Sequence, residues 1–361
     1  MPLSKIQTTN NQVVPNLGRR NVIINGAMQV AQRGTSSTGL GTADGYFTLD
    51  RFLMNIGATS AGRFTMSQST VTDLPGFANA LKLECTTADT SIAAGEQLTI
   101  DHRIEGQDLQ QFKKGTSEAE SFTVSFYAKA NANATYACEL FDVDNTRQIT
   151  KLFNVTSSWT RIILTFPPDT TGAFDDDNAL SLNLVIGLHG GSTYTSGTLN
   201  STAWASVVNG NRRGGITSFF DSTSRTLEIT GLQFEVGDTA TEFEHRSFGE
   251  ELAACQRYFQ RISGGSDAYS VSGKMQGSNS IDATIPLNVP LRASPTMNSI
   301  NSRAFHDGGF TASSSTTPTA LQFAVNDIVL AVNCAGFTGL TNNEIANWGP
   351  TSNALTIDAE L

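Results

Sequence analysis

The sequence predicts an all-β protein: an antiparallel jelly-roll β-sandwich, one short linking α-helix and a smaller C-terminal β-sandwich. Three observations predict this class. Short segments of alternating apolar and polar residues recur with turn residues between them. Gly, Ser, Thr and Asn are abundant, while charged residues make up only 16%. Helical spacing of apolar residues is sustained in one stretch only, and 361 residues suffice for two or three domains.

The first strands are predicted from period-2 alternation, which places one apolar face toward a core. It is clear in Phe122–Lys129, where Phe122, Val124, Phe126 and Ala128 share a face. The expected strands are Phe47–Asn55, Arg63–Ser67, Ala80–Cys85, Glu96–Ile104, Phe122–Lys129, Thr135–Phe141, Gln148–Asn154, Trp159–Phe166, Ser181–Leu188 and Arg225–Val236. Leu109–Lys114 is expected to form one helical turn among them. About ten short antiparallel strands with hairpin-length breaks are typical of a jelly-roll sandwich.

A change of period near residue 240 predicts the junction between two β units. Alternation ends at Val236, and Ser247 with Glu250 forms a capping-box pattern that predicts a helix start. The apolar positions that follow are spaced four, three, four and three residues apart, namely Phe248, Leu252, Cys255, Phe259 and Ile262. This spacing predicts a helix over 247–263 with a seam at these five residues, which packs either on the sandwich or around a threefold axis. His245-Arg246 is expected to tie the helix to the sandwich.

These boundaries divide the chain into four parts. We expect an attachment arm at 1–20, the jelly-roll sandwich at 21–246, the linking helix at 247–263 and a C-terminal β domain at 264–361. The strands expected in the last part are Tyr269–Gln276, Ser280–Leu287, Thr296–Ser302, Ala320–Val325, Asp327–Asn333 and Ala354–Glu360, with a hairpin at Asn326-Asp327. The apolar residues of the polar arm are candidate docking anchors, namely Leu3, Ile6, Val13, Val14 and Leu17.

Several motifs of the chain together carry a resemblance to a known family. They are Gly18–Asn21 with Ile23–Gly34 (IINGAMQVAQRG), Asp44–Tyr46 with Asp50–Phe52, Phe122–Lys129 (FTVSFYAK), Trp159–Arg161 and Ile229–Tyr258. On these motifs the chain resembles tail-fibre and related structural proteins of marine and freshwater bacteriophages, cyanophages among them. The resemblance is dense across residues 18–262, weaker beyond, and departs where Glu242 replaces a usual proline. The central part is also similar to the β-sandwich of carbohydrate-binding modules. The resemblance implies a virion component.

Aromatic and basic residues on long loops are the candidate ligand-binding residues. The Gly/Ser/Thr/Asn-rich stretch 190–215 carries Tyr194, Trp204, Arg212 and Arg213, and Trp348 lies in a polar stretch of the last part. Exposed rings stack on sugars and guanidinium groups bind hydroxyl or carboxylate oxygens. The alternative, which we favour, is that these residues fill a subunit contact or a small core of the loop itself.

Composition and motifs argue against several function classes. A net charge of −10 argues against a nucleic-acid partner, and no apolar run is long enough for membrane insertion. The four histidines are scattered, and no hydrolase, metalloprotease or nucleotide-binding motif occurs, so we expect no enzyme and no cofactor. The acidic runs 142–145 and 175–178 lack an EF-hand pattern and are expected to be solvated turns rather than calcium sites. The four separated cysteines predict free buried thiols and no zinc cluster.

The expected function is therefore that of a non-enzymatic virion protein. We expect a homotrimeric tail fibre, assembled in the host cytoplasm, attached to other virion proteins through its arm, and contributing to adhesion to host-surface glycan or lipopolysaccharide. One alternative is a capsid decoration, cement or head-fibre protein of the same fold. A second alternative is a polysaccharide-degrading tailspike.

Overall fold

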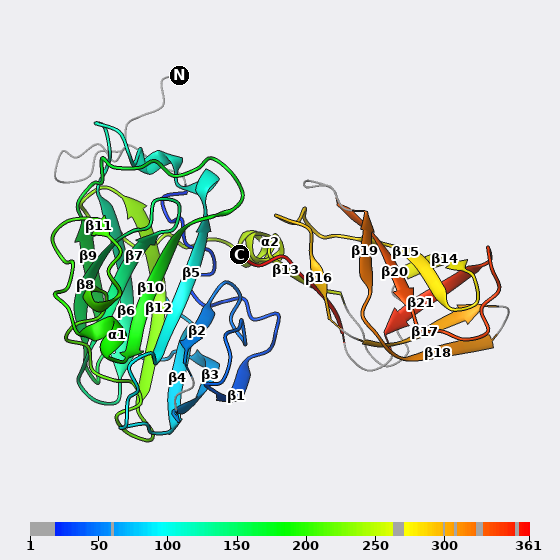
Figure 1. The fold of residues 1–361 in the computed structure, drawn as a ribbon, viewed down its shortest axis with the longest axis horizontal. Helices are drawn as coiled ribbons and strands as arrows, with labels where there is room; N and C mark the ends of the chain where they lie inside the picture. Colours follow the sequence, from blue (N-terminus) through cyan, green and yellow to red (C-terminus); the bar gives the residue numbers. More distant parts are fainter. Residues whose placement is uncertain are drawn as a thin grey trace.

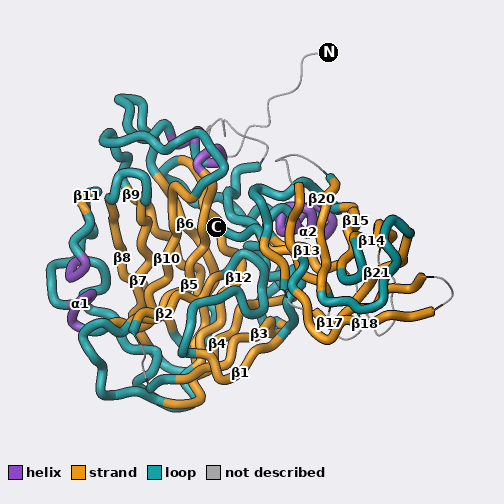
Figure 2. The backbone as a smooth tube through the Cα atoms, turned by 45° about the vertical axis from the view of Figure 1, so that its right-hand side comes forward, coloured by secondary structure: helices purple, strands orange, loops and turns teal. Residues whose placement is uncertain are grey.

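The computed structural model describes residues 19–58, 61–262, 271–298, 300–306, 309–322, 328–350 and 354–361. Two β units follow one another along the chain, with helix α2 between them (Figure 1). In Figure 2, α2 lies beside strand β13 at the boundary of the two units. The predicted arm anchors Leu3, Ile6, Val13, Val14 and Leu17 lie outside the described residues.

The first unit is a sandwich of two six-stranded antiparallel sheets. The first sheet has the order β1-β3-β4-β12-β6-β9, with β1 at Ser36–Leu40, β3 at Arg63–Thr70, β4 at Asn79–Thr87, β12 at Thr226–Val236, β6 at Phe122–Ala130 and β9 at Thr160–Phe166. The second has the order β11-β8-β7-β10-β5-β2, with β11 at Ala205–Ser206, β8 at Arg147–Val155, β7 at Ala134–Asp142, β10 at Leu180–Gly190, β5 at Gln97–Glu105 and β2 at Leu53–Gly57. The predicted jelly-roll sandwich is confirmed, because non-consecutive strands are neighbours in both sheets.

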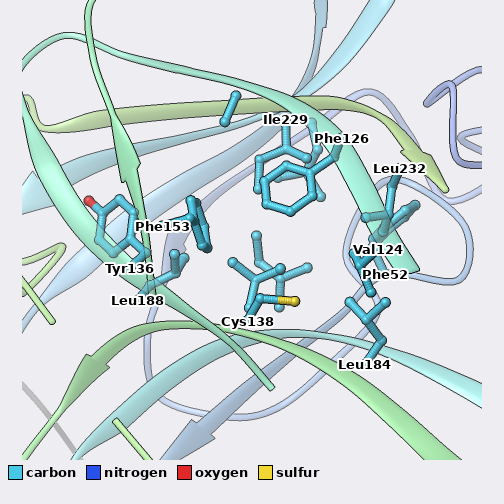
Figure 3. Packing of buried hydrophobic residues seen from close by; sticks show 14 of the residues in the cluster. Phe52, Val124, Phe126, Tyr136, Cys138, Phe153, Leu184, Leu188, Ile229 and Leu232 are labelled. Atoms are coloured by element: carbon cyan, nitrogen blue, oxygen red, sulfur yellow. The ribbon is translucent and has the colours of Figure 1, made fainter. Parts of the chain in front are cut away.

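The core lies between the two sheets and is made by the alternating residues. Phe122, Val124, Phe126 and Ala128 of β6 are each 0% exposed, as the period-2 pattern predicts. Figure 3 shows Phe126 facing Phe153 of β8, and their rings meet edge to face with centroids 5.0 Å apart. Complete burial of one such ring contributes about 1.5–3 kcal/mol. All four cysteines are buried and free.

A bulge in strand β12 explains why glycine stands at position 231. The pairing of β12 with β6 shifts register between Thr230 and Gln233. Gly231 sits in this bulge with φ at +62°, and a Cβ there would lie 2.7 Å from the Phe77 ring. Both the positive φ and the close approach therefore require glycine at this position.

The short helical turns described in the first unit lie in its connections. The turn predicted at Leu109–Lys114 is found as the 3-10 helix η2 at Gln110–Phe112, and a second 3-10 helix, η1 at Gly106–Asp108, precedes it. The long loop carries α1 at Ser192–Thr195 and η3 at Asn209–Asn211.

The linking helix is shorter than predicted. Helix α2 spans Phe248–Gln256, and Phe259 and Ile262 belong to strand β13 at Phe259–Ile262. The predicted capping box is present, with the Ser247 hydroxyl accepting from the Glu250 amide and the Glu250 carboxylate accepting from the Ser247 amide. The five seam residues therefore do not share one helical face. Phe248 is 57% exposed, whereas Cys255 is 0% exposed.

The helix ends where the chain begins to pair with a strand that lies far away in the sequence. β13 pairs with β22, at Leu355–Asp358, through all four of its residues. Backbone hydrogen bonds to the other end of the chain thus replace helical ones after Tyr258, and a local spacing rule cannot foresee this.

The second unit packs a seven-stranded sheet against a three-stranded one. The larger sheet has the order β18-β17-β21-β14-β15-β20-β19, with β18 at Gly309–Thr316, β17 at Ile300–His306, β21 at Ile345–Pro350, β14 at Val271–Gln276, β15 at Ser280–Pro286, β20 at Val329–Ala335 and β19 at Thr319–Gln322. The smaller has the order β13-β22-β16, with β16 at Thr296–Met297. Side chains of both sheets form one core, which includes Met275, Val332 and Ile357. The expected hairpin at Asn326-Asp327 lies outside the described residues.

Candidate functional site

The long loop after β10 folds back over the outer face of the second sheet. Its turn is held by a backbone hydrogen bond of 2.9 Å from Arg213 to Tyr194. Arg212 forms a bidentate pair with Glu139 of β7, at 2.7 and 3.1 Å. Arg213 donates to Gln97 of β5 at 2.7 Å, and its guanidinium carbon lies 5.1 Å from the centre of the Tyr194 ring. The structure thus brings together three of the predicted ligand residues, Tyr194, Arg212 and Arg213.

These residues close the sheet rather than present a ligand site. Glu139 is 1% exposed and Arg213 is 2% exposed. The Glu139 carboxylate is the counter-charge that burial of these guanidiniums requires, and it raises the pKa of Arg212 against the opposing effect of burial. The prediction that Arg213 contacts a ligand is therefore corrected, because its charge is buried under the loop that carries it.

A buried polar network continues along the same face. Asp101 of β5 accepts from Asn183 of β10 at 2.8 Å and from Thr99 at 2.5 Å. His189 contacts Glu96 at 3.2 Å, and burial lowers the pKa of its imidazole. The outer residues of a sheet are usually solvated, so a covering loop forces these polar groups to pair with one another.

The two predicted tryptophans lie elsewhere and are buried. Trp204 is 8% exposed, belongs to the sandwich core and donates its indole N–H to the carbonyl oxygen of Pro167 at 2.9 Å. Trp348 is 0% exposed and lies in the core of the second unit. Both corrections have one cause. Each ring packs in a core with residues far away in the sequence, such as Phe122 beside Trp204, and the polar residues next to each tryptophan give no sign of this. Neither ring is available to stack on a sugar.

The two units meet at a cluster of charged residues, in which Arg51 and Glu360 are buried and Asp358 is partly exposed. Residues 354–361 return to the first sandwich, where Arg51 pairs with Glu360 and lies 3.4 Å from the centre of the Tyr258 ring. Arg33 reaches Asp358 at 3.1 Å and Glu360 at 3.3 Å. On the other side of the junction, Arg292 donates to the backbone oxygens of Ala359, Glu360 and Asn178.

A groove of about 760 Å³ opens at this junction, within the usual size range of ligand sites. Its walls come from the segment after the arm, the η1–η2 turn, the stretch before α2, α2 itself and the turn at Val289-Pro290. Its lining mixes three arginines with three carboxylates and three glutamines, namely Arg19, Arg246, Arg257, Asp108, Glu244, Glu250, Gln107, Gln110 and Gln111. The balanced charges favour a neutral or weakly charged ligand over a polyanion.

Most charged groups of the groove already hold the junction together. Arg246 donates to the carbonyl oxygens of Ile23 and Asn21 and pairs with Glu251, so the expected tie between helix and sandwich is confirmed. Arg257 forms a bidentate pair with Glu105 at 3.0 and 2.8 Å. Desolvation and the nearby Glu105 raise the pKa of Asp108.

The sequence does not predict a ligand site at this groove. The only local signal is the density of charged residues in FEHRSFGEE, from Phe243 to Glu251. That pattern also fits a purely structural junction. The walls supplied by residues 19–24 and 107–111 come from far earlier in the chain, and only the fold brings them to α2.

The histidines, cysteines and carboxylates of the described residues are the candidate ligands of a metal site. No group of three or more His, Cys, Asp or Glu side chains there could hold a metal ion. His102 is buried, and burial keeps the pKa of its imidazole well below its usual value. Within the described ranges, no helix is long and apolar enough to cross a membrane.

Comparisons with known proteins find similarities of structure only. No family model matches the chain, and no curated protein matches it. The enzymatically active domain of bacteriophage CBA120 tailspike protein 4 is similar over 60% of this chain, with 11% identity and a TM-score of 0.31. A family 4 carbohydrate-binding module matches over 59% of this chain and 97% of its own length, with 12% identity and a TM-score of 0.30. TmCBM61, solved with β-1,4-galactotriose, matches over 60% of this chain and 99% of its own, with 7% identity and a TM-score of 0.30.

The match to the tailspike spans only 21% of that chain. At these identities and TM-scores, function has to be argued from the residues of this chain.

Proposed function

We propose that this protein is a non-enzymatic structural component of a phage virion, a rigid segment of a tail fibre that contributes to adhesion. The observation that carries the proposal is the charged junction, where Arg33, Arg51 and Arg292 fasten residues 354–361 to both units. A fibre has to transmit force between its attachment and its outer end. A buried network of ion pairs resists bending better than a solvated linker does.

The ligand class that suits adhesion is a neutral or weakly charged host-surface glycan. The junction groove is the surface we propose for it, because glutamine amides and carboxylates match the alternating donors and acceptors of sugar hydroxyls. His245, exposed on the groove wall, adds a ring that packs on Phe243 with centroids 4.8 Å apart. Weak contacts of this kind reach useful avidity only when several copies act together, which is why we propose a homotrimer.

Binding of the purified full chain to host cells and to isolated host-surface polysaccharide tests the adhesive part. We expect retention on both, without release of reducing ends. A Gln111→Trp variant, which fills the groove, should weaken binding at least tenfold. Asn154→Trp, on β8 outside the groove, is the matched control and should bind like the unchanged protein. Release of reducing ends would show a tailspike enzyme, and equal binding by both variants would remove the groove from the proposal.

Imaging of labelled virions tests the location. Ser117 is exposed in the connection before β6, and all four native cysteines are buried, so Ser117→Cys gives a unique site for a gold label. We expect the label along the tail fibres. Label over the capsid shell would instead identify a decoration or head-fibre protein.

A further inference from the structure

The ammonium group of Lys114 lies in a closed cage of oxygen atoms at one end of the first sandwich. It donates to the backbone oxygens of Thr171 at 2.9 Å and Gly172 at 2.7 Å. It also contacts a carboxylate oxygen of Asp142 at 2.6 Å and one of Asp169 at 3.2 Å. The Lys114 and Asp142 side chains are both 0% exposed, and Asp169 is 4% exposed. Two carboxylates and two carbonyls thus surround one buried positive charge.

The cage is built by three connections that lie far apart in the sequence. Lys114 follows η2, Asp142 ends β7, and Asp169 with residues 171–172 lies between β9 and β10. Asn145 links two of them, donating to Asp142 at 3.1 Å and to the Ala173 oxygen at 2.8 Å. Gly172 has φ at +70°, and a Cβ there would collide with the Asn145 side chain. Glycine is therefore required for the carbonyl to turn inward.

The second carboxylate is kept charged by a further partner. Arg147 holds Asp169 through two hydrogen bonds, at 2.8 and 3.0 Å. Burial acts against ionisation, but the bonds from Arg147 and the charge of Lys114 keep the pKa of Asp169 below its usual value. Oxygen atoms of carboxylates and backbone carbonyls are the ligands that hard cations prefer.

We propose that this cage is a structural cation site in which the chain supplies its own cation, the Lys114 ammonium. The three connections are thereby fixed as they would be around a bound Ca²⁺, but without any free ion. Asp142 and Asn145 of the acidic run at 142–145 belong to this site, so Asp142 is not the solvated turn residue that the sequence suggests. We therefore expect this site in the unchanged protein not to respond to chelators or to added calcium.

Shortening the lysine converts the cage into a site for an added metal. Lys114→Ala leaves the four oxygens and opens room for water ligands, which together approach the coordination number of Ca²⁺. Without metal, the buried Asp142 carboxylate loses the cation beside it, while Asp169 keeps Arg147. We expect the melting temperature to fall by roughly 10 °C. Millimolar CaCl₂ should recover at least half of this loss. Mg²⁺ should recover less, because it demands stricter geometry and keeps its waters.

Lys114→Met is the matched control. It removes the same charge but fills the cage with an apolar side chain, so it should be destabilised and should not respond to CaCl₂. If Lys114→Ala is insoluble without metal, expression and purification with CaCl₂ should restore soluble protein. Failure of CaCl₂ to stabilise or solubilise Lys114→Ala would overturn the proposal.

Terbium luminescence gives a readout at the site itself. The Trp204 ring lies 5.6 Å from the lysine nitrogen, close enough to excite a Tb³⁺ ion in the cage. We expect emission on indole excitation for Lys114→Ala, and none above background for the unchanged protein or Lys114→Met. Equal emission from all three would overturn the assignment. An intact mass of the unchanged protein lower by one water would also do so, because it would show an amide bond between Lys114 and Asp142 in place of the ammonium.

Discussion

Removing a buried charge at the junction should lower the free energy of unfolding more than removing a surface charge does. Arg51 is 1% exposed and its partner Glu360 is 5% exposed. Arg51→Met leaves that carboxylate in a poorly solvated site, so we expect a loss of about 3 kcal/mol in the free energy of unfolding. Lys113→Met is the control, because the exposed pair of Lys113 with Glu120 contributes less than about 1 kcal/mol. Urea denaturation of the full chain measures both, and equal losses would contradict the role of Arg51.

Asp50 gives the junction a defined pH dependence. Burial, which outweighs hydrogen bonds from Gln32 and the charge of Arg33, raises the pKa of this carboxyl to about 6. The folded protein then holds the proton more tightly than the unfolded chain does between about pH 4 and pH 6. The contribution of Asp50 to stability is therefore largest below about pH 4 and is lost as the pH rises through about 6.

Asp50→Asn removes this titration. We expect its melting temperature to vary less than that of the unchanged protein between about pH 4 and pH 6, and the difference between the two profiles to level off above about pH 7. Thermal scans across this range in buffers of equal ionic strength are the measurement. Parallel profiles would show that the pKa of Asp50 is not raised in the folded protein.

At the scale of single elements, the start of α2 depends on local chemistry. The Ser247 hydroxyl accepts from the Glu250 amide at 3.3 Å, and the Glu250 carboxylate accepts from the Ser247 amide at 3.0 Å. Ser247→Ala should cost about 1 kcal/mol and speed hydrogen exchange in the first turn of the helix. Ser247→Thr keeps the acceptor and should remain close to the original. Unchanged exchange in Ser247→Ala would show that tertiary packing alone holds the turn.

Elements that are determined by neighbouring residues could be predicted from the sequence. Elements that depend on pairing with strands far away in the sequence could not. The alternation of Phe122–Lys129 and the capping box at Ser247 were both confirmed, because neighbouring residues determine them. The helix was predicted too long, since pairing of β13 with β22 ends it. Strand β21, at Ile345–Pro350, was missed in a polar stretch whose alternate residues face a core, with Ala346 and Trp348 buried.

The candidate sites were harder still to predict from the sequence, because their residues contact partners on other strands and connections. Arg212 and Arg213 were correctly grouped with Tyr194 on one loop, but their partners Glu139 and Gln97 lie on other strands, so their burial could not be seen. The Lys114 cage joins residues from three connections. Nothing in its immediate sequence distinguishes this lysine from its exposed neighbour Lys113.

At the scale of the whole molecule, the order of the chain explains how the two β units are joined. The last strand returns to the junction, so residues from both ends of the described chain meet there. Arg33 and Arg51 come from the first sandwich, while Asp358 and Glu360 come from the final segment. Folding of the second unit therefore completes the junction, and loss of either unit leaves buried charges of the other without partners.

The oligomeric state is the remaining prediction at this scale. On α2, Phe248 is 57% exposed, and the other seam positions are half-buried or buried within the chain. A threefold contact through α2 must then centre on Phe248, supported by the β units around it, because so short a helix is marginal on its own. We expect the full chain to sediment as a trimer at micromolar concentration and Phe248→Glu to sediment as a monomer with unchanged circular dichroism.

The matched control for this substitution is Ile163→Glu, which places the same charge at another exposed apolar side chain. Ile163 is 50% exposed on β9, an edge strand of the first sheet, so this variant should remain trimeric. A monomeric full chain would remove the trimer from the proposal. A trimeric Phe248→Glu would move the threefold contact away from α2, and a monomeric Ile163→Glu would place it at the β9 edge of the sandwich instead.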